Sequence, residues 1–384
     1  MISVDEALAL VEKHRPDCGV VTLPLQKANG RIITSDIFAE FTQPAFPTSM
    51  MDGYALRKSD IGRGLTVIGE SRAGQPYDGH LSEGEAVRIF TGAILPEGAD
   101  SVEIQEYADR KREALKFTHV SHGRNYVRPA GSDFSKGDLL FAAGARITPG
   151  VMMALASANV SSVLVKKTPT VALLRGGDEL QPLGSALKTG QIIDSNGPGL
   201  KALLTGWGVE VEDLGIVSDD PKVIQDRISN CTADIIVTIG GASVGDYDHM
   251  QTSASDIGFE LIFATVAIKP GKPIWMSRRS EQVVLGLPGN PHSALACAHL
   301  FLAHLLGREL IWSTYRLTES LGSNGIRERF IRGKLDANGG VALLNAPTGV
   351  GLAIAKADVL IRRAPLADEY RAGNLVKCLH IIYR

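Results

Sequence analysis

The stretch IVTIGGASVGDYDHM, residues 236–250, decides the fold that we expect for this chain. Its first four residues favour a β-strand, which runs into the adjacent glycines Gly240 and Gly241. Such a turn exposes backbone N–H groups and can hold a phosphate or another oxyanion if a helix begins next. Asp246 and Asp248 follow, and carboxylates suit a divalent cation beside a phosphate. The stretch is therefore either an anion-and-metal site at a strand end, or a glycine-rich connection with a solvated acidic cap.

Strands alternate with helices on both sides of this stretch. VALLR (171–175) and VEVEDLGIV (209–217) have the composition of strands, whereas 198–208, 219–230 and 292–307 have that of helices. This alternation predicts a doubly wound parallel sheet. Ligands of such sheets bind at the carboxyl ends of the strands, where the glycine turns lie.

The remainder of the chain has a different pattern. Residues 3–14 predict a helix capped by Ser3 or Asp5. Short alternating runs over 49–140 predict a β-rich domain, and a strand pair at 137–149 leads into a helix at 151–159. Beyond about 315, short strands predict a small β-barrel.

Composition limits the classes of protein that fit. A chain of 384 residues is expected to form two to four domains. Its net charge of −2 argues against a general nucleic-acid binder, and no apolar run is long enough to predict a membrane span or a signal peptide. The four cysteines form no CxxC pair, which predicts neither a zinc site nor a disulfide framework and favours a reducing cytoplasm.

Two proline-bounded loops have residues suited to an anion. KPGKP (269–273) presents Lys269 and Lys272 on a stiff backbone, which suits a dianion. GLPGNPHSA (286–294) follows a strand and places Ser293 at the start of a helix, where a hydroxyl and free N–H groups can bind an anion.

Several other candidates keep a local structural alternative. Asp52 lies in an Asp-Gly turn, and Thr91 can bond an oxyanion or cap a turn. Carboxylates in GGDEL (176–180) and the Asp-Ser-Asn run at 194–196 can serve a ligand or cap a helix. His249 and His292 flank the turns, and we expect either of them at the surface rather than as a base.

Seven motifs together resemble one known family. They occur in its order and approximate spacing: MDGYA (51–55), TGAxxPEGAD (91–100), GDEL (177–180), GQIxDSN (190–196), GGxSVGxxD (240–248), KPGKP (269–273) and GLPGNPxSA (286–294). Over nearly its whole length the chain is similar to the molybdopterin molybdenumtransferases, the MoeA family, which includes the gephyrin E domain.

The resemblance implies a multidomain α/β protein that forms a homodimer. Its expected parts are a linker and dimerisation segment (1–45 and 140–168), a β-rich domain (46–139), an α/β molybdopterin-binding domain (169–312) and a C-terminal β-barrel (313–384). It implies insertion of molybdate into adenylylated molybdopterin with Mg²⁺ and release of AMP. A molybdopterin adenylyltransferase is the implied upstream donor.

The resemblance also assigns roles to individual residues. The catalytic acids are Asp52, Glu179, Asp219 and Asp248, and Glu179 and Asp248 would hold the metal. The pterin and its phosphate would contact Thr91, Asp194, Ser195, Gly240, Gly241, Ser243, Gly245, Pro288, Gly289 and Pro291. The molybdate pocket would comprise Lys269, Lys272, Pro273, Ser293 and Arg327.

Some positions depart from the family pattern. Arg175 and Gly176 replace a Ser-Thr pair, Thr265 replaces a basic residue, Ser132 replaces a glutamate before Asp133, and Val350 replaces a serine. Arg175 could supply the missing positive charge. The main alternative to the enzyme is a molybdopterin carrier, and a scaffold protein ranks below both. For the substrate, tungstate is an alternative oxyanion of similar shape.

Overall fold

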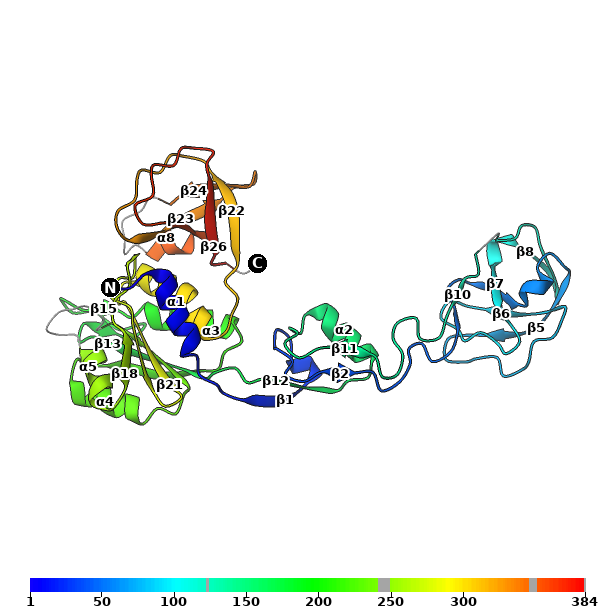
Figure 1. Ribbon diagram of the computed structural model, residues 1–384, viewed down its shortest axis with the longest axis horizontal. Coiled ribbons are helices and arrows are strands. Elements are labelled where there is room, and N and C mark those ends of the chain that lie inside the picture. Colours follow the sequence, from blue (N-terminus) through cyan, green and yellow to red (C-terminus); the bar gives the residue numbers. More distant parts are fainter. Residues whose placement is uncertain (122–123, 241–248, 345–350, 383–384) are drawn as a thin grey trace. The chain divides into compact units, whose positions relative to one another are not determined.

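The computed structural model describes residues 1–121, 124–240, 249–344 and 351–382, with the side chains of 351–352 left out. The chain divides into two compact units, which we describe separately. One comprises Met1–Gly19 and Lys167–Arg384, and the other comprises Val20–Lys166. Figure 1 labels the elements of both.

The unit Val20–Lys166 contains two two-stranded sheets and a helix that share one small core. β1 (Val20–Pro24) pairs antiparallel with β12 (Ser162–Lys166), and β2 (Ile37–Phe38) pairs with β11 (Leu139–Phe141). Helix α2 (Pro149–Ser157) is capped by Thr148, whose hydroxyl accepts the Val151 N–H. The expected helix at 151–159 is therefore present and starts two residues earlier, because proline fits the first helical turn.

The same unit contains the expected β-rich domain. Its six-stranded sheet has the order β7-β4-β6-β5-β9-β8. These strands are β4 (Gly53–Leu56), β5 (Leu65–Ser71), β6 (Glu85–Ile89), β7 (Ser101–Ile104), β8 (Ala108–Lys111) and β9 (Ala114–Phe117). A short pair, β3 (Thr48–Ser49) with β10 (Val127–Arg128), lies beside it.

The other unit contains a six-stranded sheet with helices on both faces. The order is β16-β13-β17-β21-β20-β18. The strands are β13 (Val171–Gly176), β16 (Val211–Val217), β17 (Ile235–Ile239), β18 (Glu260–Phe263), β20 (Trp275–Arg279) and β21 (Gln282–Leu287). A separate parallel pair joins β14 (Leu180–Gln181) to β15 (Ile192–Ile193).

The predicted doubly wound arrangement is confirmed, with one difference in strand direction. β20 runs antiparallel to both of its neighbours. A two-residue turn joins β20 to β21, and Ser280 there has φ +52°. Only antiparallel strands can be joined by so short a turn, because parallel neighbours need a long crossover.

Helices cover the two faces of this sheet with separate cores. Helices α4 (Pro221–Ser229) and α5 (His249–Asp256) pack on one face, against Trp275 among others. The opposite face is covered by α1 (Val4–Lys13), α3 (Asn196–Gly206) and the helical segment 291–305 (Figure 1). That segment, expected as one helix, comprises α6 (Pro291–Cys297), a π-helical stretch η4 (Ala298–Leu302) and α7 (Ala303–Leu305).

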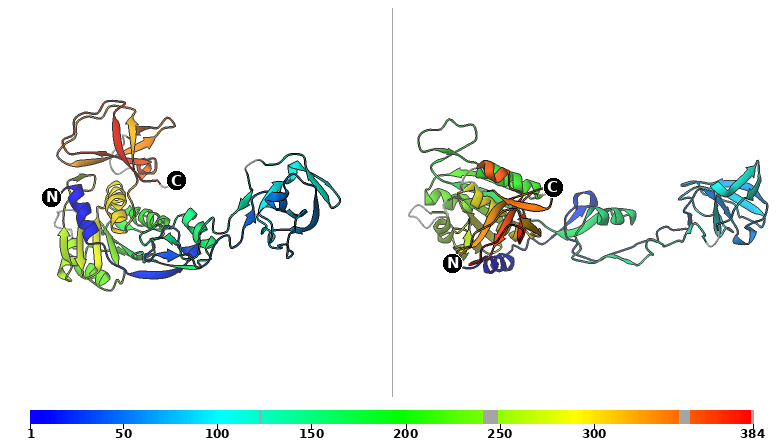
Figure 2. Two further views of the ribbon diagram at one scale, coloured as in Figure 1. Left: turned by 45° about the vertical axis from the view of Figure 1, so that its right-hand side comes forward. Right: turned by 90° about the horizontal axis from the view of Figure 1, so that it is seen from above.

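The C-terminal part forms the predicted β-barrel. Five strands close a ring in the order β23-β24-β22-β26-β25, and β25 pairs back with β23. They are β22 (Trp312–Leu317), β23 (Glu328–Leu335), β24 (Gly340–Leu343), β25 (Val359–Arg363) and β26 (Leu375–His380). Helix α8 (Gly351–Ala355) precedes β25. Phe330, Leu360 and Leu379 join the core of the α/β part, so the barrel packs against it (Figure 2).

Candidate functional site

Three parallel strands of the α/β sheet end at a crowded glycine edge. After β17, Gly240 has φ +85°, and a Cβ there would lie 2.5 Å from the carbonyl oxygen of Gly176, the last residue of β13. A Cβ on Gly289, after β21, would lie 3.5 Å from Gly240 Cα. Because glycine has no side chain, the three backbones can approach one another closely. No Cβ then shields the backbone groups at these strand ends from a ligand.

Two acidic residues lie beside this glycine edge. A Cβ on Gly177 would lie 2.5 Å from Oε2 of Glu179, and one on Gly176 would lie 3.9 Å from Oδ1 of Asp219. Asp178 Oδ1 accepts the Asp219 N–H at 3.2 Å, so Asp178 holds the loop after β16 and caps no helix. Glu179 and Asp219 form no ion pair with any residue in the described ranges. Their charges therefore remain available to a cation.

Arg175 does not supply the free positive charge that the sequence suggested. Its side chain is buried, and its guanidinium bonds Asp194 at 3.0 Å and also Asp213. A Cβ on Gly197 would lie 2.8 Å from its Nε, so the start of α3 packs directly over it. The hypothesis that Arg175 serves an oxyanion is thus not supported, because two carboxylates already neutralise it.

The start of α3 is held by Asp194 and Asn196. Asp194 Oδ1 accepts the Gly197 N–H at 2.9 Å while Oδ2 binds Arg175, whereas Ser195 makes no side-chain cap. Asn196 Nδ2 donates to the Gly289 carbonyl at 2.7 Å. Both oxygens of Asp194 are therefore engaged within the protein, and the exposed Ser195 hydroxyl is the group left to face a ligand.

The KPGKP loop packs on α6 and carries exposed lysines. Gly271 has φ +107°, and a Cβ there would lie 2.4 Å from Cys297 Sγ. Lys269 and Lys272 are exposed, Pro273 is half-buried, and neither lysine forms an ion pair within the part of the chain that the structure describes. Two uncompensated ammonium groups on a fixed loop favour anion binding.

The barrel adds further cations to this loop. In β19 (Ile268–Lys269), Lys269 pairs with Arg329 of β23. Arg327 is half-buried just before β23, and its carbonyl accepts the Asn324 Nδ2 at 3.0 Å. Like charges on neighbouring strands repel unless an anion lies with them. Arg329 is a candidate that the sequence reasoning missed, although it lies only two residues from Arg327.

The start of α6 differs from expectation in two ways. Asn290 Oδ1 accepts the N–H groups of His292 and Ser293, so these donors are not free for an anion. His292 is buried rather than at the surface, and burial lowers its pKa to about 4. The half-buried Ser293 retains a hydroxyl that bonds no residue in the described ranges, while Pro288 is buried and Pro291 begins the helix.

Asp52 and Thr91 lie in the other unit. Asp52 Oδ1 accepts both the N–H and the hydroxyl of Thr91, at 2.8 Å each. These hydrogen bonds hold the pKa of Asp52 below its usual value. The carboxylate is therefore ionised at neutral pH, as a residue that acts through its negative charge requires.

Part of the predicted site lies outside the described residues. These residues are Gly241, Ser243, Gly245, Asp248 and the family departure Val350. In the described ranges no three His, Cys, Asp or Glu side chains gather as a metal site requires. The metal assignment to Glu179 and Asp248 stays a prediction.

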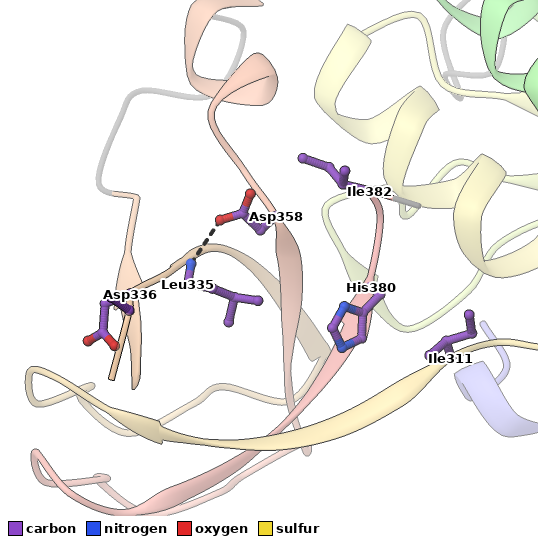
Figure 3. Close-up of a pocket in the computed structure, with 7 residues that line it drawn as sticks. Ile311, Leu335, Asp336, Asp358, His380 and Ile382 are labelled. Atoms are coloured by element: carbon purple, nitrogen blue, oxygen red, sulfur yellow. Dashed lines mark hydrogen bonds between the residues drawn. The ribbon is translucent and has the colours of Figure 1, made fainter. Parts of the chain in front are cut away.

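A cavity of about 560 Å³ lies at the barrel, and none of the residues predicted for the site lines it. Its lining is Ile311, Leu335, Asp336, Ala337, Asp358, His380 and Ile382 (Figure 3). Asp358 accepts the Leu335 N–H at 2.9 Å and a bond from Lys334, and His380 bonds Ser313 and Tyr315. Its central polar groups are thus already engaged, and we assign the glycine edge, not this cavity, as the candidate site.

Comparison with known proteins identifies the family. The molybdopterin molybdenumtransferase of Haemophilus influenzae is 35% identical over 314 residues, which are 80% of this chain and 78% of that protein. The chain belongs to the molybdopterin molybdenumtransferase family. The namesake from Staphylococcus aureus is 29% identical over 400 residues and covers 98% of this chain and 94% of its own length.

Domain models and solved structures agree with that membership. Residues 2–159 match the MoeA N-terminal region (domain I and II), and residues 172–308 match a family described as "probable molybdopterin binding domain". A crystal structure of the molybdopterin biosynthesis MoeA protein from Pyrococcus horikoshii is 28% identical, has a TM-score of 0.83 and covers 100% of both chains. The predicted family, fold class and enzyme class are confirmed, and family membership supports a role in molybdenum cofactor biosynthesis.

Within the described residues, no helix is both long and apolar enough to cross a bilayer.

Proposed function

We propose that this chain inserts molybdate into adenylylated molybdopterin in a magnesium-dependent reaction that releases AMP. The glycine edge formed by Gly176, Gly240 and Gly289 supports this function most, because its open backbone suits the phosphate of the pterin. The names of the relatives support the same chemistry.

The acidic residues fit a magnesium ion. Glu179 and Asp219 are carboxylates without a cationic partner in the described part of the chain, and oxygen ligands of this kind are those that Mg²⁺ prefers. Asp248 would complete the set from the segment after Gly240. When bound, the ion neutralises charge on the phosphoanhydride that is cleaved.

The chain's own residues would bind and orient the substrates. Lys269 ends β19, Lys272 lies in the loop after it, and Arg327 directly precedes β23, which pairs with β19. These three cations would hold molybdate as a tetrahedral dianion. The Ser293 hydroxyl and Pro273 would also lie in the pocket. Ser195 and the turn Pro288–Gly289 would contact the pterin. Asn196 bonds the Gly289 carbonyl of that turn, while Asp194 holds the start of α3 through the Gly197 N–H. Alignment of the two substrates lowers the entropic part of the barrier.

Assembly and location complete the proposal. We propose a homodimer, because the unit Val20–Lys166 exposes large apolar side chains: Phe38, Leu139 and Met153 are 53%, 51% and 75% exposed. Light scattering would measure the oligomeric state.

A molybdopterin adenylyltransferase would supply the adenylylated molybdopterin. The four free cysteines agree with a reducing cytoplasm.

The decisive experiment measures AMP release from adenylylated molybdopterin with Mg²⁺ at rising molybdate concentrations. We expect release that saturates with molybdate, that stops in Asp248→Ala, and that persists in Asp256→Ala. The second variant is a matched change at the end of α5, where the carboxylate accepts a bond from Gln225. Tight pterin binding without any AMP release would reject the enzyme and favour a molybdopterin carrier. Replacing molybdate with tungstate tests the oxyanion preference.

A further inference from the structure

The N-terminal residues lie against the strand that leads into the KPGKP loop. Ile2 donates its N–H to the Thr265 carbonyl at 3.1 Å, and its own carbonyl accepts the Ala267 N–H at 2.7 Å. This is a parallel bridge centred on Val266. Val4, Ala7 and Val11 of α1 are buried in the same core as Val266 and Ile268, so the first residues are fixed to this strand.

The other edge of that strand is bonded to the barrel. Glu328 donates its N–H to the Ala267 carbonyl at 2.8 Å, and β19 then pairs with the start of β23. Ala267 therefore binds Ile2 on one side and Glu328 on the other. Lys269 follows two residues later, so the position of the lysine loop depends on both contacts.

Side chains close these contacts into a ring. Arg362 of β25 donates Nε to the Glu328 carboxylate and Nη2 to Asp5 Oδ1 at 2.8 Å. Asp5 belongs to α1, only three residues after Ile2. These contacts form one closed chain through four segments that are distant in sequence, and its members are Ile2, Ala267, Glu328, Arg362 and Asp5.

The Arg362–Glu328 ion pair of the ring is largely buried, whereas the Arg362–Asp5 pair is exposed to solvent on the Asp5 side. The Glu328 side chain is 7% exposed and that of Arg362 is 23% exposed, whereas that of Asp5 is 75% exposed. The guanidinium also lies 5.6 Å from the centre of the Trp312 ring. A buried, charge-assisted pair has a defined geometry, while an exposed carboxylate is screened by water and salt.

We propose that Glu328 and Arg362 are positioning residues that hold the Lys269–Lys272 loop beside the barrel. The loop lysines then lie near the barrel cations Arg327 and Arg329, and this arrangement sets the affinity for the oxyanion. This inference rests on the proposed function. Neither residue need touch a ligand, because Glu328 faces Arg362 and its backbone holds Ala267. A misplacement of the lysines by about 1 Å would be enough to weaken molybdate binding strongly.

Steady-state kinetics of Arg362→Met test the proposal. We expect the KM for molybdate to rise roughly tenfold, within the range that a small misplacement can cause, while the affinity for adenylylated molybdopterin stays unchanged. Arg362→Lys should recover only part of the loss, because an ammonium cannot bridge two carboxylates as a planar guanidinium does. An unchanged KM in a folded Arg362→Met protein would overturn the proposal.

Lys334→Met is the matched control. Lys334 forms an ion pair with the buried Asp358 in the same barrel, at 3.1 Å, outside the ring. The Lys334→Met substitution also removes one cation from the barrel, so a general loss of barrel stability would appear in both variants. If Lys334→Met raised the KM equally, the effect would be one of barrel stability, and the ring would have no special role.

Amide hydrogen exchange gives a readout that needs no catalysis. Arg362→Met should speed exchange at the Ala267 and Glu328 N–H groups, and Lys334→Met should leave both protected. If the wild type released no AMP but this difference were found, the proposed function would fail while the ring stood. Should Arg362→Met not fold, Glu328→Gln removes the charge with little change of shape, and unaltered exchange and KM in it would overturn the proposal.

Discussion

Thr91 donates both its backbone N–H and its hydroxyl to the same oxygen of Asp52, at 2.8 Å each. The two bonds favour the ionised carboxylate and so hold the pKa of Asp52 below its usual value. Asp52 is thus kept anionic by a neighbour that is itself predicted to serve the ligand. Removing one of the two donors should therefore raise the pKa of Asp52 towards its ordinary value.

Thr91→Val should raise the pKa of Asp52 part of the way back to its ordinary value, since valine keeps the N–H and loses the hydroxyl. Because the folded pKa is depressed, the associated stabilisation is present above the unfolded pKa of about 3.9 and is lost as the pH falls through the folded value. NMR titration of the Asp52 carboxyl carbon measures the shift. Thr118→Val, whose hydroxyl donates to Tyr107 instead, should leave it unchanged.

Gly240→Ala should destabilise the chain more than Gly190→Ala. The two glycines have φ +85° and +86°, but a Cβ meets the Gly176 carbonyl oxygen at 2.5 Å at the first and nothing within 4 Å at the second. The control change should cost about 1–2 kcal/mol for its left-handed backbone. Urea unfolding compares them, and equal losses would show that the glycine edge is not as closely packed as described.

Arg175→Met should lower the free energy of unfolding by about 3–5 kcal/mol. The change leaves Asp194, which is 5% exposed, buried without its cation. Arg278→Met removes the partner of Glu281, a 65% exposed carboxylate, and should cost about 1 kcal/mol or less. Chemical denaturation of both variants measures the two losses. A loss below about 1 kcal/mol for Arg175→Met would contradict the role of Arg175 as the cation that neutralises Asp194.

His299→Leu should make stability less sensitive to acid. Burial lowers the pKa of His299 to about 4, and the side chain is 2% exposed. Since the unfolded chain takes up a proton near pH 6.5, stability falls as the pH drops from about 6.5 to 4, by up to about 3 kcal/mol.

Urea midpoints at several pH values test this dependence. The wild type should lose stability across that window, and His299→Leu should lose clearly less. An identical slope in His299→Leu would mean that other groups cause the acid sensitivity.

The sequence predicted elements well where local signals agree. Ser3 and Glu6 form a complete capping box at the start of α1, so one of the two proposed caps is confirmed. It could not predict that β20 runs in reverse, that 298–302 widens to a π-helix, or that His292 is buried. Each of these depends on a neighbour that is distant in sequence.

The sequence by itself determined the order of strands and helices, the glycine edge and the set of charged residues, because propensity, backbone freedom and charge are local properties. The tertiary structure alone decided which charges remain free. Arg175 is neutralised by Asp194 and Asp213, while Lys269 lies beside Arg329. The physical reason is that a charge acts on a ligand only if no opposite charge already compensates it, and strand register and packing determine that partner.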